Sequence, residues 1–224
     1  MSEFGNVKTF GGVGALLMLL GSFIPYAGPI LALVGFVLVF IAVKNISELT
    51  KDKDIFKNYL YNFIFGIIAI VVFFIILLIG FGAVGGFSWL QSLQEINITD
   101  FSSFWNYFGE IIVYVLIGLF VAWILLVIGA IYLRRCYKSI ADHTKVSMFG
   151  TTGTVYLIGS ILTIVLIGFL ILFIARILEI IAYFSLPDKL PDAADKKLSQ
   201  RKCPDCDKVI PEDALSCPYC GKKM

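Results

Sequence analysis

The sequence predicts an all-α polytopic membrane protein followed by a small cysteine-rich module. Hydrophobic residues make up 59% and charged residues only 15% of the 224 residues, and the mean hydropathy is +0.91. These values are typical of a chain embedded in a bilayer rather than of a soluble domain. Four long uncharged stretches precede the cysteines. We therefore expect three parts: a membrane domain at 1–186, a flexible charged linker at 187–202, and the cysteine-rich module at 203–224.

The uncharged stretches lie at 10–43, 58–94, 111–133 and 146–175. A helix rises about 1.5 Å per residue and the hydrocarbon core is about 30 Å thick, so about 20 residues cross it once. The first stretch is too long for one crossing and contains Pro25, Gly28 and Pro29 near its middle. Prolines and glycine favour a turn, so we expect a helical hairpin, with a single kinked and steeply tilted helix as the alternative.

The connecting segments differ in charge, which predicts the orientation of the chain. The first connecting segment, 44–57, contains four basic residues: Lys44, Lys51, Lys53 and Lys57. The third, 134–145, also contains four: Arg134, Arg135, Lys138 and Lys145. The segment 91–110 has none, and it carries the aromatic residues Phe101, Phe104, Trp105, Tyr107 and Phe108. Basic loops are retained in the cytoplasm, so we expect this middle segment at the outer interface, as an aromatic belt or a lid.

The last uncharged stretch decides on which side the cysteines lie. One crossing would deliver them outside, whereas a hairpin with a turn near Gly168 would return them to the reducing cytosol, where thiols stay free for metal binding. We therefore expect about six membrane segments, the first and last pairs being helical hairpins, in a multi-pass protein of the plasma membrane. The alternative is one long helix over 146–184 that projects from the membrane.

The cysteine-rich module has the spacing of a structural metal site. Cys203-Pro-Asp-Cys206 is followed, after ten residues, by Cys217-Pro-Tyr-Cys220-Gly221. Each Cys-x-x-Cys pair places two sulfurs on one face of a tight turn, and two such turns supply the four thiolates that Zn²⁺ prefers. Four protein ligands leave no open coordination position. We therefore expect a structural zinc ion in a C-terminal zinc ribbon.

Catalytic residues are not evident, and we do not expect an enzyme. The single histidine, His143, lies in a basic loop without a set of nucleophile, base and orienting group. The most unusual polar residues are Arg176 and Glu179, which interrupt an apolar run three residues apart and so share a helix face. They form a candidate intramembrane polar pair along a solute path, or an intrahelical pair near the interface whose arginine extends to water.

Two resemblances follow from these residues. The segment from Cys203 to Gly221 resembles the short zinc-ribbon domain often fused to prokaryotic membrane proteins, although Asp207 stands where that family commonly has glycine. Residues 23–30, 55–58 and 168–184 resemble the domain of unknown function 996 family of multi-span prokaryotic membrane proteins. The resemblance implies a multi-span membrane protein and brings no activity and no site residues beyond the cysteines.

Two classes of function remain. In the first, the membrane domain is an anchor and the cytoplasmic ribbon recruits a cytoplasmic or membrane protein through a small apolar surface formed by Val209, Ile210, Leu215 and Tyr219. In the second, the membrane domain transports or senses a small solute or a lipid, and the ribbon is regulatory. The net charge of +2 does not favour a nucleic-acid partner. We expect the lipid bilayer as a further partner, and a homo-oligomer is compatible with the sequence.

Overall fold

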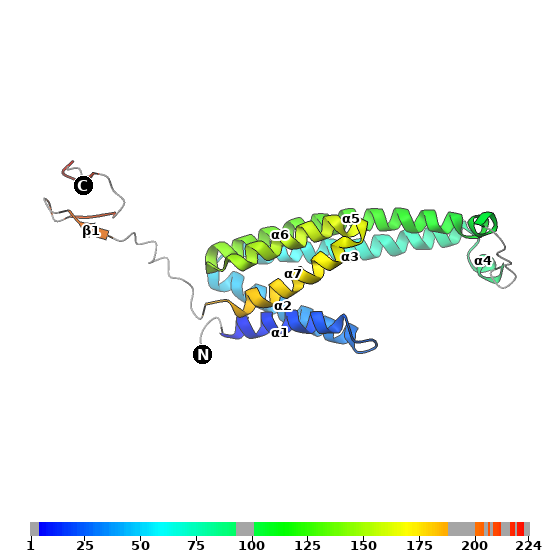
Figure 1. Ribbon diagram of the computed structural model, residues 1–224, viewed down its shortest axis with the longest axis horizontal. Helices are drawn as coiled ribbons and strands as arrows, with labels where there is room; N and C mark the ends of the chain where they lie inside the picture. Colours follow the sequence, from blue (N-terminus) through cyan, green and yellow to red (C-terminus); the bar gives the residue numbers. More distant parts are fainter. Residues whose placement is uncertain are drawn as a thin grey trace.

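The computed structural model describes residues 5–92, 101–187, 200–203, 206, 208–211, 216–217 and 219–221. Within these ranges the membrane domain is helical and the C-terminal module contains two short strands (Figure 1). The helices are α1 (Gly5–Gly21), α2 (Gly28–Thr50), α3 (Lys53–Ala83), α4 (Phe87–Ser92), α5 (Phe101–Thr144), α6 (Ser147–Leu162), the 3₁₀ helix η2 (Thr163–Val165) and α7 (Ile167–Phe184). The strands are β1 (Gln200–Lys202) and β2 (Val209–Pro211). The linker expected at 187–202 falls mostly on 188–199, outside the described residues.

Five helical segments of the described chain are long and apolar enough to cross a membrane. They are Gly28–Thr50, Lys53–Ala83, Phe108–Thr144, Ser147–Val165 and Ile167–Phe184. Helix α1 is shorter, with 17 residues, and packs along α2. The expected all-α polytopic architecture is therefore confirmed, with α1 as the sixth apolar segment.

The first hairpin forms at the proline-containing segment, as expected. Helix α1 ends at Gly21, and α2 begins at Gly28 with a proline in its first turn, where a missing backbone N–H costs nothing. The two glycines face each other so closely that a methyl group on Gly28 would collide with the Gly21 carbonyl oxygen. The alternative of a single kinked helix is therefore wrong, because the chain reverses between two helices that pack along each other.

The last apolar stretch also forms a hairpin, but its turn lies before the expected position. Helix α6 ends at Leu162, the 3₁₀ turn η2 follows, and Leu166 adopts a left-handed conformation with φ of 63°. Gly168, expected at the turn, instead lies in the first turn of α7, where a methyl group would collide with the Gly159 carbonyl oxygen. The glycine thus permits close packing of α6 and α7 rather than making the turn, and the alternative of one long helix is wrong.

The aromatic segment expected to rest at the outer interface is helical from Phe101 onward. Residues 101–110 form the first turns of α5, which continues without a break for 44 residues to Thr144 and pairs along its length with α3. At the other end of this pair, Asp52 caps α3 by accepting a hydrogen bond from the Asp54 backbone N–H at 2.9 Å. Its second carboxylate oxygen accepts one from the Ser139 hydroxyl of α5 at 2.6 Å, which joins the two helices.

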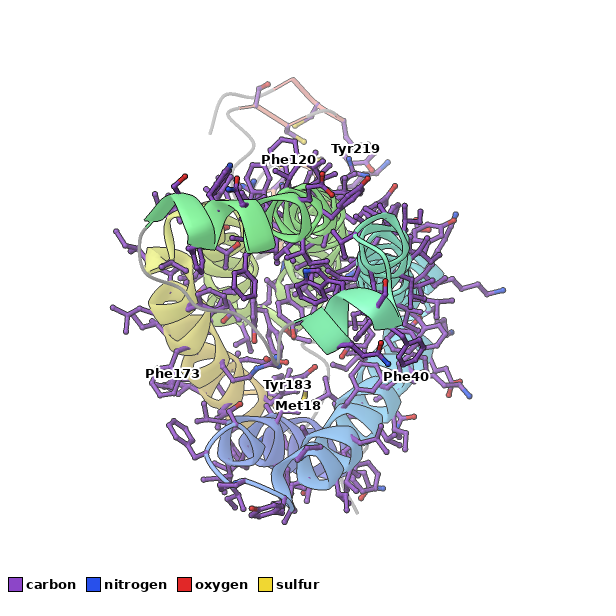
Figure 2. The ribbon with its side chains drawn as sticks, turned by 90° about the vertical axis from the view of Figure 1, so that its right-hand side faces the viewer. Met18, Phe40, Phe120, Phe173, Tyr183 and Tyr219 are labelled. Atoms are coloured by element: carbon purple, nitrogen blue, oxygen red, sulfur yellow. The ribbon has the colours of Figure 1, made fainter. Side chains whose placement is uncertain are left out.

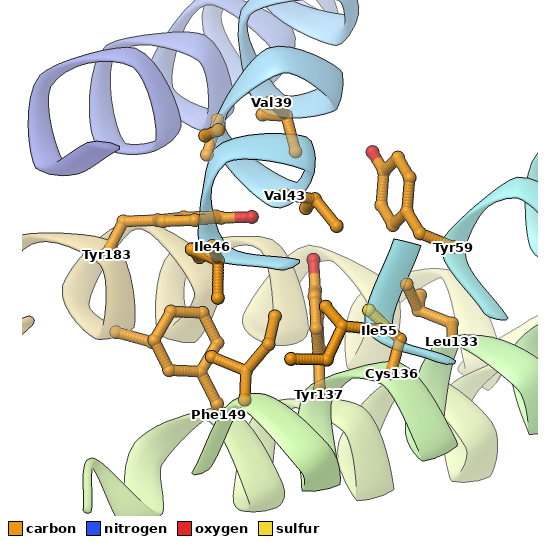
Figure 3. Close-up of a cluster of buried hydrophobic side chains, with 14 of the residues drawn as sticks. Val39, Val43, Ile46, Ile55, Tyr59, Leu133, Cys136, Tyr137, Phe149 and Tyr183 are labelled. Atoms are coloured by element: carbon orange, nitrogen blue, oxygen red, sulfur yellow. The ribbon is translucent and has the colours of Figure 1, made fainter. Parts of the chain in front are cut away.

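The six long helices are arranged in a closed ring. In order around it, α3 packs on α5, then α6, α7, α1 and α2, and α2 returns to α3. Figure 2 shows this arrangement end-on, with Tyr183 and Met18 near the middle. The buried core lies at the end of the helix bundle that carries the α2–α3 and α5–α6 connections. Figure 3 shows this core in close-up, and its labelled members are Val39, Val43, Ile46, Ile55, Tyr59, Leu133, Cys136, Tyr137, Phe149 and Tyr183.

Candidate metal centre and buried ion pair

The backbone of the C-terminal module places its cysteines at the ends of tight turns. Strands β1 and β2 pair antiparallel, and Cys203 follows β1 directly. The Cys203 N–H donates to the Lys208 carbonyl oxygen at 2.9 Å, which closes the first turn. The Gly221 N–H donates to the Cys217 carbonyl oxygen at 2.8 Å and closes the second. Gly221 has φ of 73°, a conformation that glycine adopts without strain.

The four sulfur atoms of Cys203, Cys206, Cys217 and Cys220 lie within 4.8 Å of one another. The Cys203 and Cys220 Sγ atoms are 3.6 Å apart, and those of Cys206 and Cys217 are 3.7 Å apart. A tetrahedral site with zinc–sulfur bonds of about 2.3 Å requires sulfur atoms about 3.8 Å apart. The two turns therefore bring the four expected ligands to the spacing that a tetrahedral metal ion requires.

The electrostatics of the second pair favour the form of cysteine that binds a metal. Burial opposes ionisation of Cys217, but hydrogen bonds from the backbone N–H groups of Tyr219 and Cys220 outweigh it and lower the pKa of the Cys217 thiol to about 6. The Lys208 backbone also lowers the pKa of Cys206, but burial and the neighbouring thiols raise it above its ordinary value. A thiolate at Cys217 is therefore available near neutral pH. Because four cysteines fill a tetrahedral site, the centre suits a structural ion.

Arg176 and Glu179 form an ion pair inside the membrane domain. The Arg176 Nη1 atom lies 2.8 Å from the Glu179 Oε2 atom, and the guanidinium also lies over the Tyr156 ring. Glu179 is 1% exposed and accepts two further hydrogen bonds, from the Tyr137 hydroxyl at 2.7 Å and the Tyr156 hydroxyl at 2.6 Å. The carboxylate is thus surrounded by donors from α5, α6 and α7, an arrangement that ties three helices together.

The two tyrosines were not singled out from the sequence, since a tyrosine in an apolar run is also common as a packing residue. The signal that could have found them is the buried acid itself. A carboxylate inside a helix bundle needs donors, and the tyrosine hydroxyl is a neutral donor on a side chain long enough to reach across from a neighbouring helix.

A cavity of about 340 Å³ lies between α2, α3 and α5. Asn62 and two glycines, Gly66 and Gly129, interrupt an otherwise apolar lining. The full lining set is Phe36, Asn62, Phe63, Gly66, Ile67, Ile70, Leu126 and Gly129. Neither Arg176 nor Glu179 lines it. No sequence signal marked this cavity, because its residues come from three separate helices.

His143 lies in a small polar group without catalytic geometry. Its Nδ1 atom is 2.9 Å from the Ser139 carbonyl oxygen and 3.9 Å from an Asp52 carboxylate oxygen. The Ser139 hydroxyl donates to that same carboxylate rather than to the imidazole. The serine therefore has no imidazole base, and the group serves to join α5 to the start of α3.

The fold and the metal centre together define the chain as a polytopic helical membrane protein with a C-terminal four-cysteine module. It belongs to the family described as protein of unknown function DUF996, whose model matches residues 31–177. Residues 201–221 match the uncharacterised protein family UPF0547. The uncharacterized protein MJ1644 of Methanocaldococcus jannaschii is 36% identical over 189 residues, which cover 84% of this chain and 96% of the relative. No solved structure matches.

Proposed function

We propose that this protein is a membrane-anchored interaction module, in which the helical domain holds a zinc ribbon at the cytoplasmic face of the plasma membrane and the ribbon binds a protein partner. The observation that carries the proposal is Tyr219, placed between two metal-ligating cysteines with 62% of its surface exposed. The four-cysteine site supports a structural role for the zinc, which leaves recognition to the surface of the ribbon.

Tyr219 has the properties of a recognition residue. Its ring lies beneath the Lys208 ammonium, 4.6 Å from the ring centroid, and this contact orients an aromatic side chain on the surface. Tyrosine is enriched where proteins bind one another, because it offers a rigid apolar face and a polar tip. Leu215 lies outside the described residues, and the side chains of Val209 and Ile210 are not described, so Tyr219 alone supports the expected surface.

The orientation is supported by the distribution of basic residues. Four basic residues lie in or near the α2–α3 connection and four in or near the α5–α6 connection, and both connections lie at the end of the bundle where α7 stops (Figure 1). The short helix α4 lies at the opposite end, next to a segment without lysine or arginine. Basic connections are retained in the cytoplasm, so the ribbon that follows α7 starts from the cytoplasmic face.

The test is crosslinking in native membranes followed by purification of the intact chain and of three variants. These are a truncation after Pro191, Tyr219→Ala, and Ser216→Ala, which changes a neighbouring exposed residue of the ribbon as a matched control. We expect one set of crosslinked proteins to disappear in the first two and to persist in the control. The same set in the truncated chain would contradict the proposal, because the ribbon would then be unnecessary.

The cavity between α2, α3 and α5 supports a second candidate function, the binding of a lipid or small apolar solute. Its lining is mostly apolar and contains one amide, at Asn62, which suits a lipid chain with a polar group nearby. Nothing lies within 4 Å of a methyl group built at Gly66 or at Gly82. Gly66→Leu would fill the cavity, and Gly82→Leu, on the same helix outside it, is the control.

Native mass spectrometry of protein released from its own membranes distinguishes the two leucine variants. A retained lipid should be lost from Gly66→Leu and kept by Gly82→Leu. Equal retention in both, or none in the unchanged chain, would remove this candidate and leave the interaction module.

A further inference from the structure

Where they pack against the bundle, the two hairpins do not reach the far end of the uncharged span of α5. The uncharged part of α5, residues 111–133, has a length of about 34 Å, enough to cross the hydrocarbon core of about 30 Å. Helix α6 passes the charged end of this span at Gly153, where a methyl group would lie 3.1 Å from the Arg134 Cα atom. It ends near Trp123, whose indole N–H donates to the Ser160 carbonyl oxygen at 3.0 Å.

These two contacts set the depth of the second hairpin. From Gly153 to Ser160 α6 rises about 10 Å, and the few residues of the turn beyond Ser160 add about 5 Å. The turn at 163–166 therefore lies about 15 Å from the charged end of α5, well short of the far side of the hydrocarbon core.

Helices α3 and α5 continue without the hairpins beyond this depth. Gly118 packs against the Phe73 ring, and Gly80 packs against Tyr114, so the two helices stay paired towards α4. The outer surface of this part is apolar, and Leu78 is 69% exposed. An exposed apolar surface of this kind belongs in lipid, so the hydrocarbon core extends past the hairpin turns.

The first hairpin ends at a similar depth. The Phe23 ring, in its turn, packs edge-on against the Phe173 ring of α7 with centroids 5.9 Å apart. Leu172, which precedes Phe173 on α7, packs against Gly159 near the end of α6, so the turn of the first hairpin lies beside the end of the second. The length of α2 does not contradict this depth, because its last turns, from Lys44 onward, lie beyond the uncharged stretch.

The chemistry of both turns suits a place inside lipid. Their most exposed side chains are large, with Tyr26 fully exposed and Leu166 exposed over 74% of its surface, and neither turn contains a charged residue. Two carbonyl groups at the end of α6 have donors other than water. The Trp123 indole N–H donates to the oxygens of Ser160 and Ile161, and the Thr163 hydroxyl donates to Ser160 at 2.6 Å.

The first turn also satisfies part of its backbone within the chain. The Ser22 hydroxyl donates to the Met18 carbonyl oxygen at 3.2 Å, and the N–H groups of Ser22, Phe23 and Gly28 donate to carbonyl oxygens of the α1 end and the turn. Backbone inside hydrocarbon requires such internal partners, since each unsatisfied group costs several kcal/mol there.

We propose that both hairpins are re-entrant: each enters the bilayer from the basic face, turns inside the hydrocarbon core and returns to the same face. Lipid acyl chains of the opposite leaflet cover the two turns. Among the described helices only α3 and α5 then cross the membrane completely. Residues 10–43 and 146–175 are membrane segments that never reach the opposite aqueous phase.

The test is cysteine accessibility in intact cells, with four single substitutions in the full chain. Tyr26→Cys and Leu166→Cys report on the turns, Gln91→Cys on the α4 end, and Lys51→Cys on the basic face. Each is treated with a membrane-impermeant and with a permeant maleimide, and labelling is measured at each position by peptide mass spectrometry, so that the native cysteines do not contribute. Labelling after solubilisation in denaturing detergent verifies that each thiol is present and reactive in the inserted chain.

In intact cells we expect neither maleimide to label the cysteines at positions 26 and 166. Each control cysteine should react with at least one of the two maleimides. Labelling of Leu166→Cys or Tyr26→Cys by either reagent at the rate of Gln91→Cys would overturn the proposal, because the turns would then reach the water on the α4 side. The result does not depend on the proposed orientation. If the orientation is reversed, the two controls exchange their patterns and the turns stay unlabelled.

Discussion

Replacement of Glu179 tests whether the buried ion pair holds the helical domain together. Three donors converge on its carboxylate: Arg176 at 2.8 Å, Tyr137 at 2.7 Å and Tyr156 at 2.6 Å. Glu179→Ala leaves all three without this acceptor, and removal of one partner from a buried pair costs about 3–5 kcal/mol. Tyr137→Phe removes one hydrogen bond and leaves the other two, so we expect a loss of about 1 kcal/mol, as for hydrogen bonds between membrane helices.

The assay is equilibrium unfolding by sodium dodecyl sulfate in mixed micelles, followed by circular dichroism. A double-mutant cycle between Glu179→Ala and Tyr137→Phe isolates the coupling free energy between these two residues. In the Glu179→Ala background the tyrosine hydroxyl has already lost its acceptor, so adding Tyr137→Phe should cost almost nothing. The coupling should therefore be close to the full loss of stability caused by Tyr137→Phe alone. Tyr61→Phe, which changes an exposed tyrosine of α3, is the control and should shift stability by less than about 0.5 kcal/mol. A Glu179→Ala chain as stable as this control would refute the reasoning.

The remaining predictions concern the metal centre, the first hairpin and the cap of α3. Cys217→Ser should abolish metal binding by the ribbon while the chain still inserts, and one zinc per chain in the purified variant would contradict the four-cysteine site. Gly28→Val should force α1 and α2 apart and destabilise the domain by about 1–3 kcal/mol. Gly82→Val, whose added side chain meets no neighbour, is the control and should leave stability unchanged. Equal unfolding midpoints for the two variants would disprove the close approach of Gly28 to Gly21. Asp52→Ala should cost about 1 kcal/mol through the lost cap and the lost Ser139 bond, and a stability unchanged in the same unfolding assay would count against both contacts.

The contacts at Glu179 also show where sequence reasoning stops. The spacing of Arg176 and Glu179 placed them on one helix face, and the structure has them paired there. The sequence could not show that Tyr137 and Tyr156, which are 42 and 23 residues away from Glu179, also donate to its carboxylate. Hydrogen bonds between helices depend on how those helices pack. The cavity between α2, α3 and α5 was missed for the same reason.

The segment 101–110 forms the start of α5, and its expected place at the outer interface stays a prediction. One local expectation was wrong for a related reason. Gly168 was expected to make a turn, but it serves close packing with Gly159, and the turn falls at Leu166, a residue that gives no turn signal. A glycine can permit a left-handed backbone or a close approach, and only the neighbouring helix decides between them.

The sequence by itself determined the class of the protein, the first hairpin and the four candidate metal ligands. Hydropathy, proline content and Cys-x-x-Cys spacing act within a few residues of the chain, so they can be interpreted without a structure. The tertiary structure alone decided the ring of helices, the donors around Glu179, and the place beside α5 where the second hairpin turns. These depend on contacts between residues far apart in the chain, such as Trp123 with Ser160, which no local pattern encodes.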